Sequence, residues 1–234
     1  DISEAAMQEK LPKQLVRGID EVVKEKPQYL WYEADTELGD ECLSSIDPDK
    51  PLVVLIGDSH INHWADVIAH IARTRSYQTL SFAGCMALTQ DDLLFDDNMK
   101  CPGFEERLET ILKALTPEVI LSSSKLHTPL SVFDNPAAVT SWLSRQKSFI
   151  ELLSPLTQSW LVVGDTPELD LHVPDCLSEN RDAVGRCGRP IEIATSAVMR
   201  SAEKKLTEDL TQSLGRNIAY VDPVVWLCTQ TCPG

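Results

Sequence analysis

The feature that most constrains the fold is an alternation of short apolar segments with helical periodicity beyond residue 50. Apolar residues recur at helical spacing between segments, for example from Phe104 to Leu115. Short buried strands alternating with helices are typical of a parallel sheet covered on both faces. We therefore predict an α/β fold with a five-stranded parallel sheet. Its strands would be Leu52–Ile56, Gln78–Phe82, Val119–Ser122, Trp160–Val163 and Ile218–Val221.

Two of the helices between these strands can be predicted in more detail. The helix after the first strand would bury one face made of Ile61, Trp64, Val67, Ile68 and Ile71. The last helix would end at Gly215, a typical C-cap residue. Its apolar face would be made of Val198, Leu206, Leu210 and Leu214.

Residues 1–50 differ from the rest because they are charged and contain Pro27 and a short aromatic segment, Tyr29–Tyr32. We predict a helical or linker extension there, followed by one domain over residues 51–234. No apolar run approaches the roughly 18 residues that a membrane-spanning helix needs. The chain opens on Asp1 without a signal-like stretch, so we expect a processed product or an excised piece.

The formal net charge is -15. A surface this acidic repels phosphate backbones and anionic lipids, so we predict no nucleic-acid partner.

The chain contains seven cysteines, none of them in the C-x-x-C spacing of a zinc site. Several lie in polar turns, where buried reduced thiols are not expected, so an oxidising compartment is favoured. We predict disulfide bridges that close short loops, and Cys42 is then left with a partner unknown. The predicted pairs are Cys176–Cys187, Cys228–Cys232 and Cys85–Cys101.

A polar cluster follows the first predicted strand, where Gly57-Asp58-Ser59-His60 succeeds PLVVLI. In a parallel sheet, ligand sites lie at the carboxyl ends of the strands. A purely structural interpretation makes Gly57 a turn residue and Asp58 and Ser59 helix caps, but it does not account for His60. A nucleophilic interpretation makes Ser59 an exposed hydroxyl, with oxyanion donors at the helix start.

A metal site is a third interpretation of the same residues. Asp58-Ser59-His60 has the D-x-H form of a binuclear phosphoesterase, and Asp165 could supply a second aspartate after a later strand. Such sites need further ligands, typically Asn and late histidines. No histidine follows His172, so we predict no metal.

The Gly57-Asp58-Ser59 segment, with Gly84 after the second strand, resembles the first two blocks of the SGNH (GDSL-like) hydrolases. That family has a flavodoxin-like, three-layer sandwich. GDSHINHW, Gly84-Cys85, VVGDTPELDLHVPDCL and VDPVVWLC together resemble one branch, the periplasmic SGNH domain of acyltransferase-3 membrane proteins. The likeness covers residues 42 to 234.

The resemblance implies a serine nucleophile, Ser59, whose oxyanion is held by the N–H groups of Ser59 and Gly84. Asp58 would brace the turn through backbone hydrogen bonds, and His60 and His63 would have supporting positions. The family branch O-acetylates lipopolysaccharide and other surface glycans. Acetyl-CoA is cytoplasmic, so the domain would bind no cofactor itself and would receive the acetyl group through a fused or associated membrane domain.

Two departures from the family pattern stand out. The third block runs VILSSSKLHT, without the usual Asn donor, so Ser123, Ser124 or His127 would have to replace it. The D-x-x-H that supplies the general base is absent before Gly234, so we expect the base downstream, with His127 or His63 as alternatives. Without that base, residues 1–234 alone would be inactive or slow.

The resemblance leaves two other functions open. One is a carbohydrate acetylesterase, and the other is a non-catalytic glycan-binding module with the same fold.

Overall fold

The computed structural model describes residues 30–33, 46–83, 103–126 and 130–232. The chain divides into two compact units. The larger unit comprises Pro27–Asp165 and Val198–Val221. The smaller unit comprises Asp1–Lys26, Thr166–Ala197 and Asp222–Gly234.

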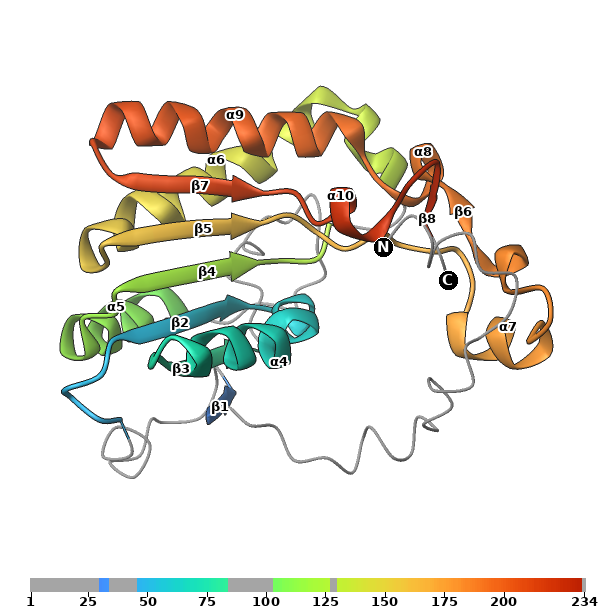
Figure 1. Cartoon of the computed structure of the whole chain (residues 1–234). Coiled ribbons are helices and arrows are strands. Elements are labelled where there is room, and N and C mark those ends of the chain that lie inside the picture. The colour runs from blue at the N-terminus through green and yellow to red at the C-terminus, as the bar shows by residue number, and fades with distance from the viewer. Residues whose placement is uncertain (1–29, 34–45, 84–102, 127–129, 233–234) are drawn as a thin grey trace. The chain divides into compact units, whose positions relative to one another are not determined.

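The larger unit is built on a six-stranded sheet in the order β1-β3-β2-β4-β5-β7. All neighbouring strands in it are parallel, as the arrows of β2, β4, β5 and β7 show in Figure 1. The predicted five-stranded parallel sheet is confirmed, and its order β3-β2-β4-β5-β7 is the flavodoxin-like one. The strands are β1 (Leu30–Glu33), β2 (Leu52–Gly57), β3 (Gln78–Ala83), β4 (Val119–Ser123), β5 (Ser159–Val163) and β7 (Asn217–Val221).

Strand β1 was not predicted as a strand. It overlaps the aromatic segment of the N-terminal extension and pairs with β3 at the edge of the sheet. The remainder of the proposed extension, apart from residues 46–50, lies outside the described residues. The boundary at residue 50 therefore stays a prediction.

Two apolar layers cover the sheet. Alternate residues of β2 point to opposite faces, so Val54 and Ile56 join one cluster while Val53 and Leu55 join another. The first cluster contains residues of α5 (Phe104–Leu115), α6 (Pro136–Leu153) and α9 (Ala197–Leu214), and the second contains residues of α4 (Ser59–Thr74). Short 3₁₀ helices occupy Leu130–Asp134 and Ser154–Leu156. The predicted three-layer arrangement therefore holds.

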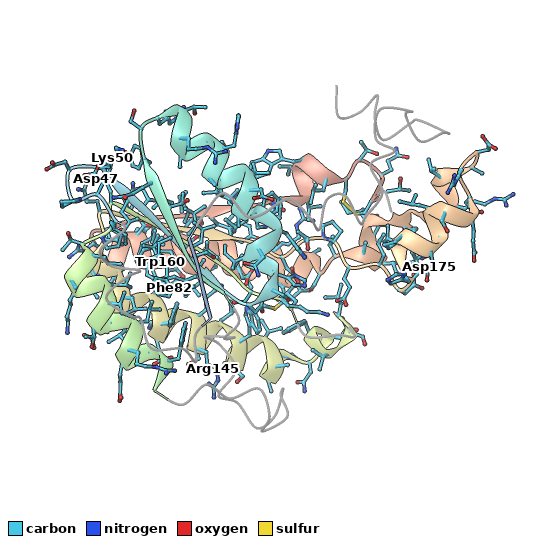
Figure 2. The ribbon with its side chains drawn as sticks, turned by 90° about the horizontal axis from the view of Figure 1, so that it is seen from below. Asp47, Lys50, Phe82, Arg145, Trp160 and Asp175 are labelled. Atoms are coloured by element: carbon cyan, nitrogen blue, oxygen red, sulfur yellow. A yellow bond between two sulfur atoms is a disulfide. The ribbon has the colours of Figure 1, made fainter. Side chains whose placement is uncertain are left out.

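The first cluster is centred on large aromatic side chains. Phe82 and Trp160 are almost fully buried, and Figure 2 shows both among the side chains in the interior. The ring of Trp160 packs edge-on against Phe149 at a centroid distance of 5.8 Å. Its indole N–H donates to Ser122 Oγ at 2.9 Å, so a polar group inside the core is satisfied.

The predicted helix α4 is present, and its predicted buried face was wrong in part: Ile61 is buried and Trp64 and Ile68 pack beside it, but two other members are exposed. Val67 and Ile71 are 52% and 46% exposed. The fully buried residues recur at i, i+4 and i, i+3 spacing, and three of the four are alanines. They are Ile61, Ala65, Ala69 and Ala72. Small side chains let a helix approach a sheet closely, and Val67 and Ile71 lie on the outside.

The buried face of α9 was also wrong in part. Val198 and Leu214 are exposed, whereas Glu203 and Thr207 are buried on the same face as Leu210. Apolar periodicity could not find a stripe that contains a carboxylate. Gly215 has a φ of 61° just after the helix, in agreement with its predicted role as a C-cap.

The smaller unit has short elements and little apolar core. Its buried cluster consists of Ala194, Val224, Cys228 and Cys232. Disulfides join Cys176 to Cys187 and Cys228 to Cys232, so both of these predicted bridges are present. Its elements are α7 (Val173–Glu179), η5 (Val184–Cys187), β6 (Arg189–Pro190), α8 (Ile191–Ala194), α10 (Val224–Leu227) and β8 (Thr231–Cys232).

Several predictions fall on residues that the structure does not describe. They concern Cys42, Gly84, Cys85, Cys101 and His127. Within the described ranges, no helix is both long and apolar enough to span a bilayer.

Candidate active site

The site begins at the turn that leaves β2, the strand between β3 and β4. Gly57 ends β2 and pairs with Ser123 of β4. A Cβ atom on Gly57 would lie 1.9 Å from the carbonyl oxygen of Ser123. Glycine is therefore required here for close approach of two backbones, which allows the chain to turn tightly before Asp58.

Asp58 caps α4 and also reaches the neighbouring strand. Its Oδ1 accepts the N–H of His60 at 2.7 Å, and its Oδ2 accepts the N–H of Lys125, just past β4, at 2.7 Å. These are the backbone hydrogen bonds predicted for Asp58. Burial raises the pKa of Asp58, and the two N–H donors act against that rise.

Ser59 is the first residue of α4 and is exposed. The backbone N–H groups of the first helical turn have no intrahelical partner, so the N–H of Ser59 is available at the helix end. Positive potential at a helix N-terminus favours a developing negative charge. Ser59 thus combines an accessible hydroxyl with a backbone donor beside it.

His60 turns away from solvent toward the end of β5. Its Nδ1 is hydrogen-bonded to Oδ1 of Asp165, with side chains that are only 13% and 5% exposed. The other oxygen of Asp165 accepts the N–H of Leu126 at 2.8 Å. Residues 105 positions apart in the sequence are thereby joined.

These contacts close a circuit, which we call the strand-end ring: Asp58, His60, Lys125, Leu126 and Asp165. Each of the two carboxylates gives one oxygen to His60 and the other to one of two consecutive backbone N–H groups. The ring joins the chain segments that follow β2, β4 and β5.

The contacts of His60 shift its pKa. Burial by itself lowers the pKa of His60, but the hydrogen bond to Asp165 and the charges of Asp165 and Asp58 outweigh it, so the pKa is raised. His63, whose ring centroid is 4.7 Å from that of His60, has a pKa lowered by burial and by the charge of His60.

The residues considered as replacements for the third-block Asn differ from one another in burial. Ser123 is buried and Ser124 is partly buried, while His127 and the predicted oxyanion residue Gly84 lie outside the described residues. His70 is exposed farther along α4. In the described ranges, no three or more His, Cys, Asp or Glu side chains form a group suited to a metal ion.

A second polar cluster lies beneath the turn, around Glu203 of α9. Trp142 Nε1 and Gln146 Nε2 donate to Glu203 Oε1 at 3.0 and 3.2 Å. Burial raises the pKa of Glu203 to about 7, against the lowering effect of those donors. A cavity of about 20 Å³, which is enough for one water molecule, is lined by Glu203, Gln146, Ser123 and Gly57 among others.

Sequence reasoning missed the roles of Asp165 and Glu203. Asp165 was considered only as a metal ligand, although a polar residue directly after Trp160–Val163 is itself a signal, because parallel strands end at one edge of a sheet. Nothing in the sequence around Glu203 marks it as buried.

Comparison with solved structures supports the fold. The periplasmic domain of a lipopolysaccharide acetyltransferase from Salmonella ser. Paratyphi A superposes with a TM-score of 0.55 and 18% identity, over 84% of this chain and 77% of that one. At this identity the likeness shows a shared fold. A catalytic mutant of the acetylxylan esterase Axe2 from Geobacillus stearothermophilus gives a TM-score of 0.37 and 10% identity, over 72% and 74% of the two chains, too low to carry an argument.

No curated protein matches the chain in sequence. A family model does match, and it describes the SGNH domain that is fused to AT3 domains. The match runs over residues 28–234 and includes the Ser59 turn, the ring and both disulfides. Since the match covers most of the chain, this protein belongs to the family of SGNH domains fused to AT3 domains.

Proposed function

We propose that this domain is the extracytoplasmic part of a membrane O-acyltransferase and transfers acetyl groups to a cell-surface glycan through Ser59. The observation that carries the proposal is the position of Ser59. It is an exposed hydroxyl at the first position of α4, on a turn held in place by Gly57 and Asp58. Membership of the SGNH family is consistent with acyl transfer or ester hydrolysis at this residue.

The proposed reaction has two steps. Ser59 Oγ attacks the carbonyl carbon of the acyl donor while its proton passes to a base, and the oxyanion is held by the N–H of Ser59 and, as predicted, of Gly84. The donor's leaving group departs with a proton, which leaves an acyl-serine. A sugar hydroxyl then attacks the acyl carbon, gives its proton to the base, and Ser59 Oγ regains a proton.

The base in this proposal is the histidine of a D-x-x-H segment that we expect beyond Gly234. Asp58 is buried and each of its oxygens accepts a backbone N–H, so we assign it the bracing role. His60 directly follows Ser59 in α4, and side chains at i and i+1 of a helix do not face each other.

We further propose that the partner domain lies in the membrane and supplies the acetyl group from cytoplasmic acetyl-CoA, so that this domain binds no cofactor itself. Fusion of the family to AT3 domains supports a membrane partner. The disulfides Cys176–Cys187 and Cys228–Cys232 support an oxidising compartment such as the periplasm.

The test is Ser59→Ala in the protein that carries this domain together with its AT3 domain, with Ser201→Ala, an exposed serine of α9, as the matched control. We expect glycan acetylation to be lost in Ser59→Ala and retained in the control, and a fluorophosphonate probe to label the wild type at Ser59 alone. Acetylation at the wild-type level in Ser59→Ala would contradict the proposal.

The same experiment separates the competing functions. Release of free acetate without acetylated glycan would indicate an esterase, in which water replaces the sugar hydroxyl. A wild-type protein that binds glycan but is never labelled at Ser59 would indicate a binding module.

A further inference from the structure

The strand-end ring raises a question that the proposed chemistry does not answer, namely why a buried His–Asp pair lies directly beside the nucleophile. His60 and Asp165 belong to different segments, α4 and the chain after β5, and they meet only through the fold. Asp165 has both oxygens engaged, one by His60 and the other by Leu126. Burial and hydrogen bonding together hold the two side chains of this pair in one orientation.

We propose that His60 and Asp165 are positioning residues for Ser59, which act by locking the Ser59 turn to the exits of β4 and β5. The proposal rests on the proposed function and assigns to it two residues that act through the turn. His60 contributes through its Nδ1 contact to Asp165 and through its backbone N–H, which Asp58 accepts at 2.7 Å.

The geometry argues against a direct role of His60 as the base for Ser59. The two residues are consecutive in α4, and side chains at i and i+1 of a helix do not face each other. The imidazole is directed instead to Asp165 at the end of β5, two strands away from β2 in the sheet. The pair therefore holds the turn that carries Ser59 against the end of β5.

The chain segment after β4 connects the His60–Asp165 contact to catalysis. Lys125 and Leu126 follow β4 in the stretch where related enzymes carry the third block, and this chain lacks the usual Asn there. Asp58 and Asp165 hold these two consecutive N–H groups at 2.7 and 2.8 Å. The ring thus fixes the distance between Ser59 and the β4 exit, and small errors in such distances cost large factors in rate.

The decisive test compares His60→Ala, His60→Asn and His60→Gln in the protein with its AT3 domain. The amide nitrogen of Asn can occupy the position of Nδ1 and donate to Asp165, whereas that of Gln corresponds to Nε2. We expect acetyl transfer to fall about 10²-fold in His60→Ala and His60→Gln, and to recover to within about threefold of wild type in His60→Asn. Asp165→Ala should match His60→Ala, and His70→Asn, an exposed histidine on the same helix, should leave transfer unchanged.

Each alternative outcome overturns the positioning role. Recovery by His60→Gln but not by His60→Asn would show that Nε2 acts directly on a reacting group. Wild-type transfer in His60→Ala would show that the pair has no part in the reaction.

A stability measurement separates this inference from the proposed function. The melting temperature of His60→Ala should fall and that of His60→Asn should recover, whatever reaction the domain catalyses. Failure of the fluorophosphonate probe to label wild-type Ser59 would contradict the proposed function while this pattern persisted. Normal labelling with equal melting temperatures for all three variants would contradict the positioning role alone.

Discussion

The larger unit contains two buried carboxylate sites, and different kinds of partner surround them. In the strand-end ring, Asp58 and Asp165 face backbone N–H groups and the imidazole of His60. In the cluster around Glu203, the donors are neutral side chains, among them those of Trp142 and Gln146.

Burial raises the pKa of both Asp58 and Glu203, but the groups that act against the rise differ. At Asp58 these are the backbone N–H groups of His60 and Lys125 and the charge of His60. At Glu203 the neutral donors lower the pKa by less than full burial raises it, so the pKa rises to about 7. One site contains an imidazole among its partners, and among the described residues the other has neutral donors alone.

The largest expected effect is the pH dependence of stability caused by Glu203. Its pKa is 4.5 before burial and about 7 in the folded protein, so the associated stability is fully present below pH 4.5 and is lost as pH rises through 7. At 1.36 kcal/mol per pKa unit, the loss amounts to about 3 kcal/mol. Glu203→Gln keeps the acceptor for Trp142 and Gln146 and should remove this loss, as urea unfolding from pH 4.5 to 8 would measure.

Above pH 6.5 both proteins should still lose stability, because the raised pKa of His60 makes its contribution disappear as pH increases. An identical pH slope in wild type and Glu203→Gln would show that Glu203 is not the titrating group.

A smaller effect is expected from Asp58, which has two distinct contacts. Asp58→Ala removes both the cap to His60 and the contact to Lys125, so we expect about 2 kcal/mol of destabilisation. Asp58→Ser retains the cap and should cost about 1 kcal/mol. Chemical unfolding at pH 7 measures both, and equal costs for the two variants would mean that the contact to the β4 exit contributes nothing.

The smallest effect is expected from Trp142→Phe, which keeps most of the ring volume but removes one donor to Glu203. We expect a cost of about 1 kcal/mol at pH 7. Because that donor lowers the pKa of Glu203, the midpoint of the stability loss should move above pH 7. A midpoint that stays in place or moves down would contradict the role of the indole N–H.

Much of the fold was predictable because it depends on local patterns. Alternating apolar segments located five strands, and Gly57-Asp58-Ser59 located the turn at the end of β2. The short loops that close Cys176–Cys187 and Cys228–Cys232 were also predictable, because partners so close in the sequence can meet through a local turn. The buried faces of α4 and α9 were only partly predictable, since apolar periodicity gives no weight to alanine or to a buried acid.

What the sequence determined by itself is therefore the set of strands and helices, the exposed serine at a strand end and two of the cross-links. Only the tertiary structure decided that Asp165 meets His60 and that Glu203 is buried beside Trp142. The physical reason is that these contacts depend on the order in which strands pair and on which face a helix presents. A polar side chain carries no local sign of either, because its partner is brought to it by the packing of the whole sheet.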